Sequence, residues 1–469
     1  MADRNRAFSV ALAILCILAT GCEAEPVSPR LFVHGVTLID GTGGAPVPSS
    51  TIIMRGRRIE AVEPSDSIRP EPGDSVIDGT GLWAIPGLFD AHVHLSKTGR
   101  EALPVLAAMG VTSVRDMGGD LDELREMRRA IAAGDVIGPR IYLAGPMLEA
   151  PATLERMRES ETSEPYERTR IAIPDTGRAR TVVDSLADLA IDFVKIREYE
   201  SEATYRAVVE AARARGLAVA GHAPFSMDPV EGAELGLVSF EHASYPYPLD
   251  TVPEARAKVL DAFVRNGIAI VPTLVAWETH VMDPDSLAAL VADSTGARDP
   301  RNALISDRLR QEWRVDVEEI GPRSAGYYAG YWGFLDRQST DLAVMYRAGV
   351  PLAAGTDLAT AGLFPGYSLH DELERLVEWV GLTPLEAIEA ATRTPAELLA
   401  AADSLGTIEP GKLADIVLLT ADPSADIRHT RGVHGVVREG GYLGPDRICE
   451  LLAGVSPAAT GTIGLVRRP

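Results

Sequence analysis

The sequence predicts an α/β fold, in which a (β/α)8 TIM barrel is joined to a small β-sandwich domain formed from both chain ends. Three observations support this fold class. Short β-rich runs lie near both chain ends, strand-like and helix-like stretches alternate between them, and metal-competent side chains follow several central strands. The 469 residues, 46% of them hydrophobic, are enough for one large domain and a smaller partner.

The first residues have the pattern of an export signal. A short basic region precedes an almost wholly apolar run over residues 8–19, which is too short to span a bilayer. The run leads into Leu18-Ala19-Thr20-Gly21-Cys22, which resembles a bacterial lipoprotein cleavage box. We therefore predict a lipoprotein-type signal peptide over residues 1–21 and lipidation of Cys22. The protein would be an exported periplasmic or cell-surface lipoprotein, held at a membrane only by this anchor, or secreted if the box is not used.

The charge of the chain excludes one class of partner. The formal net charge at pH 7 is −22. Proteins that bind nucleic acid need a basic surface to meet the phosphates, so we expect no nucleic-acid partner. Acidity of this kind is typical of a solvated, soluble surface.

Both chain ends carry short β-rich runs separated by turn signals. The runs cover residues 31–39, 51–54, 58–62, 414–419 and 433–438. The same pattern of short β-rich runs flanks a long middle region on both sides. We therefore predict one composite β-sandwich domain from residues 30–85 and 400–445, and a barrel domain over 86–399.

The middle of the chain alternates between strand-like and helix-like stretches. One predicted helix runs from Ser201 to Arg215, with Ser201 at its start. Eight such β/α units are typical of a TIM barrel, in which the chemistry lies at the carboxyl ends of the strands. The predicted strands are the run ending in His92-Val93-His94 and residues 112–115, 140–144, 192–196, 217–221, 238–241, 269–272 and 351–355.

Metal-competent side chains lie at the ends of five of these strands. His92 and His94 are spaced i and i+2, so a strand would place both imidazoles on one face, where they could bind one ion. Taken singly, a histidine or aspartate at a strand end is usually a hydrogen-bonded structural residue or a cap. A buried lysine is more unusual, because burying an ammonium is costly. Together, the six groups favour a metal centre. The other four are Lys195, His222, His242 and Asp357.

These motifs resemble those of the metal-dependent amidohydrolase superfamily, in particular its prolidase- and imidazolonepropionase-like branch. The resemblance spans nearly the whole mature chain and is specific for the fold and metal centre, but it is a poor guide to the substrate. It rests on residues 86–94, 114–119, 193–196, 221–223, 241–243, 355–357, 391–392 and 406–415.

The resemblance implies a binuclear centre with two divalent ions. His92, His94 and Asp357 would hold one ion, and His222 and His242 the other. Lys195, carboxylated on its amine to N6-carboxylysine, would bridge both ions. The histidine and carboxylate ligands favour Zn²⁺, although manganese, cobalt and iron accept such ligands too.

The same resemblance implies a hydrolytic reaction on a carbon–nitrogen amide bond. The two ions would activate a bridging hydroxide, and Asp357 would act as the general base and pass the proton to the leaving amine. The expected substrate is a small amide, either a dipeptide of the Xaa-Pro type or an N-acyl amino acid. Whether the protein forms a homo-oligomer is left open.

Two other functions remain open at this point. The first is a mononuclear deaminase or an imidazolone-type cyclic amidohydrolase on the same scaffold, and Lys195 argues against it. The second belongs to another class, a non-catalytic binding scaffold with the same fold. The intact set of ligands argues against that alternative.

Other residues near the expected barrel mouth are weaker candidates. Arg197, Tyr199 and Tyr245 could bind a substrate carboxylate or an oxyanion, or could simply pack the loops. Arg115 and Asp116 are expected to brace the second strand. His370 is expected to be structural.

Residues 277–339 form a long insertion before the last strand. It contains five aromatic residues between positions 327 and 334. We expect either an aromatic lid over the site or an amphipathic helix that packs its aromatic side chains on the barrel.

Overall fold

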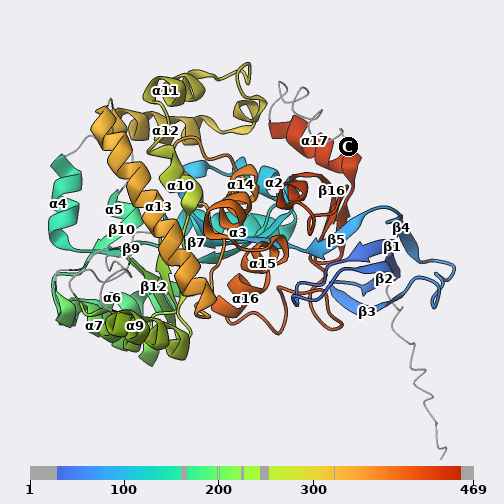
Figure 1. The fold of residues 1–469 in the computed structure, drawn as a ribbon, viewed down its shortest axis with the longest axis horizontal. Coiled ribbons are helices and arrows are strands. Elements are labelled where there is room, and N and C mark those ends of the chain that lie inside the picture. Colours follow the sequence, from blue (N-terminus) through green and yellow to red (C-terminus); the bar gives the residue numbers. More distant parts are fainter. Residues whose placement is uncertain are drawn as a thin grey trace, which may run out of the picture.

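The computed structural model describes residues 29–159, 166–197, 199, 201–222, 227–242, 253–321 and 323–455. The predicted signal peptide, Cys22 and Tyr245 lie outside the described residues. Figure 1 shows a strand-rich part, blue at one side of the molecule, beside a larger part in which helices surround parallel strands. Within the described residues, no helix combines the length and the apolar composition needed to cross a bilayer.

Strands from both chain ends form one continuous sheet. Its order is β17-β16-β15-β5-β1-β2-β3, and β4 pairs with β1. The antiparallel pairing of β5 with β15 joins the two ends, with Ala84 opposite Leu418. The sheet encloses a hydrophobic core of its own, which includes Val33, Ile52 and Ile416. The strands are β1 (Arg30–Leu38), β2 (Val47–Arg55), β3 (Arg58–Pro64), β4 (Ser75–Asp78), β5 (Trp83–Pro86), β15 (Ile416–Leu419), β16 (Val433–Arg438) and β17 (Gly441–Leu443).

Seven predicted strands of the middle region are parallel strands in the structure. They read as apolar runs because helices cover the outside of the sheet and side chains fill the inside. They are β6 (Leu88–Val93), β7 (Val111–Asp116), β8 (Arg140–Leu143), β11 (Phe193–Ile196), β12 (Ala218–Gly221), β13 (Ser239–Glu241) and β14 (Ala269–Val271).

The eighth predicted strand, residues 351–355, is an extended segment between β14 and β6. The amide of Ala353 donates to the carbonyl of Ile270 at 2.9 Å, and the amide of Ala91 donates to Ala354 at 2.9 Å. On the opposite side, the amide of Asp192 donates to Leu143 at 2.9 Å and connects β8 to β11. The fold class, a barrel of the (β/α)8 type with an added strand domain, is confirmed; the exact domain boundaries stay a prediction.

Two short strands that the sequence did not predict follow β8. These are β9 (Met147–Glu149) and β10 (Arg170–Ala172), which pair with each other in parallel. β9 also contacts β11, where Leu148 lies opposite Ile196. Three-residue strands are too short for a hydrophobic period to show, which explains why the sequence pattern did not predict them.

The helices cover the barrel and extend it on one side (Figure 1). As predicted, Ser201 caps the helix that follows it and accepts a hydrogen bond from the amide of Thr204. The helices are α1 (Leu95–Thr98), α2 (Ala102–Ala108), α3 (Leu121–Ala133), α4 (Pro151–Glu159), α5 (Tyr166–Thr169), α6 (Thr176–Asp188), α7 (Glu202–Ala214), α8 (Pro229–Glu234), α9 (Pro253–Asn266), α10 (Leu274–Thr279), α11 (Pro284–Ala292), α12 (Asp307–Ile320), α13 (Ala325–Arg347), α14 (Tyr367–Arg375), α15 (Pro384–Ala390), α16 (Arg393–Leu398) and α17 (Pro445–Val455).

The insertion before the eighth strand is helical. α11 and α12 share a small core around Trp313, whose ring meets Phe364 edge to face at 5.2 Å. The long helix α13 buries Leu342 and Met345 in its second half. The helix therefore packs on the barrel through aliphatic side chains, and not through the aromatic ones that the packing alternative had predicted.

Candidate metal centre

His92 lies in β6 and is almost fully buried, with 1% of its surface exposed. The eighth barrel segment passes directly beside it. A Cβ on Gly355 would lie 2.9 Å from the Cβ of His92 and 2.7 Å from Cγ1 of Val271. Position 355 therefore needs glycine for this close approach. His94 follows as the N-cap of α1, and Asp357 stands two residues after Gly355.

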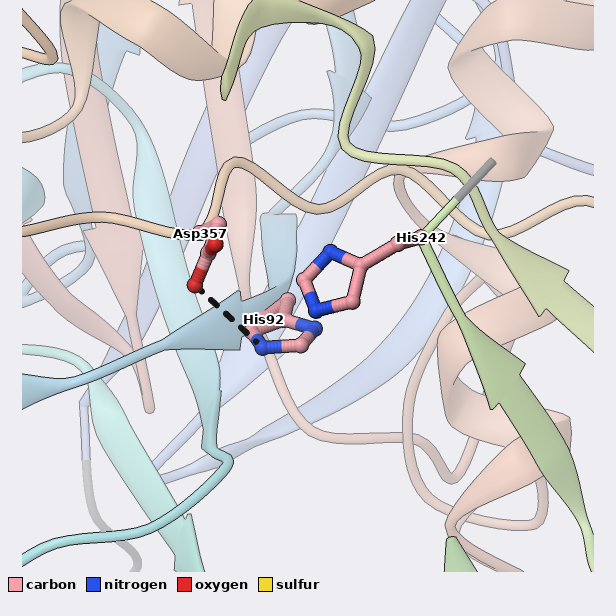
Figure 2. Close-up of side chains that lie close together, drawn as sticks. All are labelled: His92, His242 and Asp357. Atoms are coloured by element: carbon pink, nitrogen blue, oxygen red, sulfur yellow. Dashed lines mark ion pairs between the residues drawn. The ribbon is translucent and has the colours of Figure 1, made fainter. Parts of the chain in front are cut away.

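His92, His242 and Asp357 form the centre of the site. One ligand atom from each lies within 4.8 Å of the others, and Figure 2 shows the three side chains converging from separate elements. Oδ1 of Asp357 lies 3.4 Å from Nε2 of His92 and 3.3 Å from Nε2 of His94. The ring of His222 lies 4.9 Å from that of His242 between centroids. The structure thus brings these five predicted side chains together.

Lys195 lies in β11 with 1% of its surface exposed. Its Nζ is buried and has no hydrogen-bond partner in the described part of the chain. Burial lowers the pKa of Lys195 to about 8, and its charge acts on Glu241, Asp357 and His222, which places it beside the same cluster. A buried amine without a partner is costly, so its presence here needs an explanation.

The protonation of His92 follows from its neighbours. Its Nδ1 lies 2.9 Å from Oε2 of Glu241, and a carboxylate only accepts, so Nδ1 carries the hydrogen. Burial lowers the pKa of His92 to about 4, which leaves the ring neutral with a lone pair on Nε2. That atom lies 3.4 Å from the Asp357 carboxylate. Two acceptors at this distance repel each other unless a cation lies between them, so the geometry fits a divalent metal ion.

The other histidines are also held for coordination. Nδ1 of His94 donates to the carbonyl of Gly118 at 2.8 Å, which leaves Nε2 as the nitrogen that faces Asp357. Nδ1 of His242 lies 2.9 Å from the hydroxyl of Thr273. Burial lowers the pKa of His242 to about 3 and that of His222 well below its usual value. Neutral imidazoles are the form that binds metals.

Three residues at the site have left-handed backbone conformations. The φ angles are 68° at His242, 51° at Thr273 and 59° at Asp357. Non-glycine residues adopt this region rarely, and a β-branched threonine more rarely still. Such strain tends to gather where side chains must be aimed at a ligand.

A buried carboxylate that the sequence analysis overlooked supports the centre. Glu241, 2% exposed, accepts hydrogen bonds from Nδ1 of His92, from Nη2 of Arg115 at 2.7 Å and from the hydroxyl of Ser239 at 2.5 Å. Arg115 also donates to the carbonyl of Ala91 at 2.7 Å. Burial alone would raise the pKa of Glu241. The neighbouring Arg115 and His92 lower that pKa by more, so the carboxylate stays ionised. The sequence held one sign of this role, because Glu241 is a charged residue directly before His242 at the end of a predicted strand.

Other buried acids hold the backbone around the ligands. Asp116 accepts from the amides of Leu95 and Gly118, and so fixes the chain on both sides of the His94 ring. Glu372 of α14 accepts from the amides of Leu274 and Val275 at 3.1 and 2.9 Å. It thereby holds the start of α10, directly after Thr273.

The weaker candidates fall into different environments. Arg197 lies 3.2 Å from Glu149, a fully buried carboxylate that also binds Arg170 at 2.5 Å. The ring of Tyr199 packs edge to face on Tyr205 at 4.6 Å, as expected for loop packing. His370 is buried away from the site.

His370 has both ring nitrogens engaged. They lie 3.0 Å from the hydroxyl of Thr430 and 3.0 Å from the carbonyl of Met109. The arrangement gives it a structural role between α14 and its neighbours.

Comparison with known proteins decides the family. Residues 83–441 match the amidohydrolase family, and this match covers most of the chain. The chain belongs to this family. It is a hydrolase that acts on carbon–nitrogen bonds, and its family generally uses divalent metal ions.

Individual relatives are distant but cover most of the chain. An imidazolonepropionase of Pseudomonas syringae pv. tomato is 26% identical over 408 residues, 82% of this chain and 91% of the relative. A candidate prolidase from Bifidobacterium longum has a similar structure, with a TM-score of 0.68 and 24% identity over 92% of this chain and 100% of that one. A Xaa-Pro dipeptidase with bound methionine gives a TM-score of 0.65 and 23% identity over 88% of this chain and 100% of that one. The two structural likenesses show the fold alone.

Proposed function

We propose that this amidohydrolase holds two divalent ions, Zn²⁺ by preference, and hydrolyses the amide bond of a Xaa-Pro dipeptide or an N-acyl amino acid. The observation that carries the proposal is the buried Nζ of Lys195. It has no partner among the described residues, although its charge acts on three of the candidate histidines and on Asp357. A single ion on His92, His94 and Asp357 would leave this amine unexplained.

Carboxylation of Lys195 removes the difficulty. With its pKa lowered to about 8 by burial, a fraction of the amine is neutral near pH 7 and can attack carbon dioxide. A bond forms between Nζ and the carbon, and Nζ loses one proton. The product would be an anionic carbamate that could serve as a metal ligand, and the charge of the ions would compensate its buried negative charge.

The bound ions would lower the pKa of a water molecule and polarise the substrate carbonyl. Asp357 is the proposed general base at this point, because its carboxylate adjoins the histidine cluster and stays ionised. Burial raises its pKa, but the surrounding histidines lower it well below the usual value. The carboxylate can take a proton from the water and deliver it to the leaving amine. Arg197 and Tyr245 remain proposed substrate contacts.

Counting the metal ions tests the proposal. Wild-type protein and the variants Lys195→Ala and Lys258→Ala are loaded with zinc, desalted and measured by plasma mass spectrometry. We expect two ions per chain in the wild type, one or fewer in Lys195→Ala, and two in the control, because Lys258 is exposed on α9. A carbon-13 carbamate signal from labelled bicarbonate should be present only when Lys195 is. One tightly bound ion in the wild type would overturn the binuclear centre.

The second candidate reaction is hydrolysis of a cyclic amide of the imidazolone type, favoured by the name of the imidazolonepropionase relative. Xaa-Pro dipeptides, N-acyl amino acids and imidazolone rings are assayed with the same zinc-loaded preparation. We expect turnover of the linear amides. Turnover of the ring compounds alone would replace our substrate assignment.

We further propose that the protein is exported and anchored through lipid on Cys22. The support is the apolar run and the cleavage box of the sequence. Expression with labelled palmitate should label the wild type in the membrane fraction. Cys22→Ser should lose both the label and the membrane association; labelled Cys22→Ser would contradict the anchor.

A further inference from the structure

An aromatic cluster lies beside the metal centre, where α10 meets the first half of α13. Figure 1 shows these two helices next to each other over the barrel. The rings come from segments about fifty residues apart in sequence, so the insertion delivers them to the site. The aromatic cluster consists of Trp277, His280, Tyr327, Tyr328, Tyr331 and Phe334.

The cluster reaches the proposed ligands directly. The ring of Trp277 meets that of His242 edge to face, with 6.1 Å between centroids and an interplanar angle of 88°. Trp277 also lies 5.4 Å from Phe334, and Tyr331 stacks on His280 at 5.4 Å with 7° between the planes. All of these rings are only partly buried, so they form a wall and not a closed core.

Three polar atoms in this wall lack a partner. Nε1 of Trp277 and the hydroxyls of Tyr328 and Tyr331 are buried and make no hydrogen bond in the described part of the chain. Buried polar atoms are almost always paired in native proteins, because an unpaired one is costly. Three of them in one cluster beside a reaction centre indicate that a bound molecule supplies what is missing.

The type of atom limits what that molecule is. An indole N–H can only donate, so Trp277 needs an acceptor and gains nothing from an ammonium group. The ring walls favour a planar aromatic group, which they can meet edge to face or in an offset stack, over an aliphatic group of equal size.

We propose that the aromatic cluster is the subsite for a planar ring of the amide substrate, and that this ring carries a hydrogen-bond acceptor. The inference rests on the proposed function, because it places the ring next to the bond that the centre hydrolyses. It assigns the first half of α13 to substrate recognition, whereas the second half packs on the barrel.

Binding is measured with analogues that cannot be hydrolysed. A failure of the proposed subsite can then be told apart from a failure of the proposed reaction. The probes are reduced-amide analogues, in which a methylene replaces the scissile carbonyl, and isothermal calorimetry measures their affinity for the zinc-loaded protein. One series varies the acyl side and another the amine side, each with cyclohexyl, phenyl and pyridyl groups. In one of the two series we expect pyridyl to bind more tightly than phenyl and phenyl more tightly than cyclohexyl, by about fivefold at each step.

Variants separate the ring wall from the donors. Trp277→Ala should abolish the preference for phenyl over cyclohexyl. Trp277→Phe and Tyr331→Phe keep the rings, and at least one of them should abolish only the preference for pyridyl. Trp332→Ala is the matched control, because Trp332 stands on the same helix with 48% of its surface exposed; it should leave the order unchanged.

Two results would overturn the subsite. One is equal affinity for phenyl and cyclohexyl in both series with the wild-type protein. The other is an order of affinities that survives in Trp277→Ala. A protein that binds the ring analogues in the expected order but hydrolyses no amide would refute the proposed function and leave the subsite standing.

Discussion

The two ends of the barrel both bury charged groups, but they treat them differently. At the end that faces the strand domain, Arg140 begins β8 and lies 2.9 Å from Asp415 and 2.7 Å from Glu439. At the other end, Lys195 is buried without a hydrogen-bond partner among the residues that the structure describes, and neutral histidines surround an ionised aspartate. The first end is an ion-pair joint between two parts of the chain.

Left-handed backbone occurs at both ends. His242, Thr273 and Asp357 at the metal end each carry or support a candidate ligand, while Glu439 of the ion-pair joint also has a positive φ, of 48°. Buried charged and polar groups that have no partner within the protein mark a site that a bound ligand completes. The difference between the ends therefore points to function more sharply than burial of charge alone would.

The largest effect is expected from Asp357→Asn. Asparagine keeps an oxygen near the histidines but cannot take a proton, so kcat should fall by about 10²- to 10⁴-fold on any amide that the wild type hydrolyses. Initial rates at saturating substrate measure this. Asp283→Asn serves as the control, because Asp283 caps α11 at the surface and asparagine caps as well as aspartate. A kcat within a few-fold of wild type in Asp357→Asn would exclude it as the general base.

Glu241→Gln tests whether the metal end depends on its buried carboxylate. The change leaves the Arg115 guanidinium buried without its counter-charge, which should lower the free energy of unfolding by about 3–5 kcal/mol. It also removes the acceptor that orients His92, so zinc affinity should fall by about 10- to 100-fold. Urea titrations and zinc competition with a chelator measure the two effects. The matched change Glu210→Gln, on an exposed position of α7, should alter neither.

If Glu241→Gln lowered stability but left zinc affinity unchanged, the carboxylate would be structural only. The metal end would then resemble the opposite end more closely than we infer.

Sequence reasoning found the barrel strands and the candidate ligands for a physical reason. Parallel strands are buried on both faces and appear as apolar runs, and the chemistry of this fold collects at their carboxyl ends. The positions of Lys195, His222, His242 and Asp357 at those ends could therefore be seen without a structure.

What the sequence could not show depends on contacts between distant residues. Glu241 and Glu149 look like any charged residue near a strand end, and only three-dimensional pairing with Arg115 or Arg170 reveals them as buried. The pairing of β5 with β15 joins residues more than three hundred positions apart, which no local pattern encodes. The aromatic cluster likewise needs α10 and α13 to meet.

A buried histidine outside the metal centre should make stability depend on pH. Burial lowers the pKa of His370 to about 4, below its value of 6.5 in the unfolded chain. Its contribution to stability is therefore fully present above pH 6.5 and is lost as the pH falls toward 4, by up to about 3 kcal/mol. His370→Gln can keep hydrogen bonds to Thr430 and Met109 but cannot gain this charge.

The unfolding free energies of the wild type and His370→Gln are compared by urea titration between pH 4 and pH 8. The curves should diverge with acidification, with the wild type losing more stability. Parallel curves would show that His370 is not neutral in the folded protein.

The smallest effect is expected at the opposite end of the barrel, from Asp415→Asn. The asparagine can still accept from the amide of Glu439, and Arg140 keeps Glu439 as a counter-charge. We expect a loss of about 1–2 kcal/mol in the free energy of unfolding, because one charged hydrogen bond is weakened and no charge is stranded. Zinc content and kcat should match the wild type, since no residue of this joint contacts the metal end. A change in zinc affinity would show that the ion-pair joint between barrel and strand domain also positions the ligands, and the two ends would have to be treated as one coupled unit.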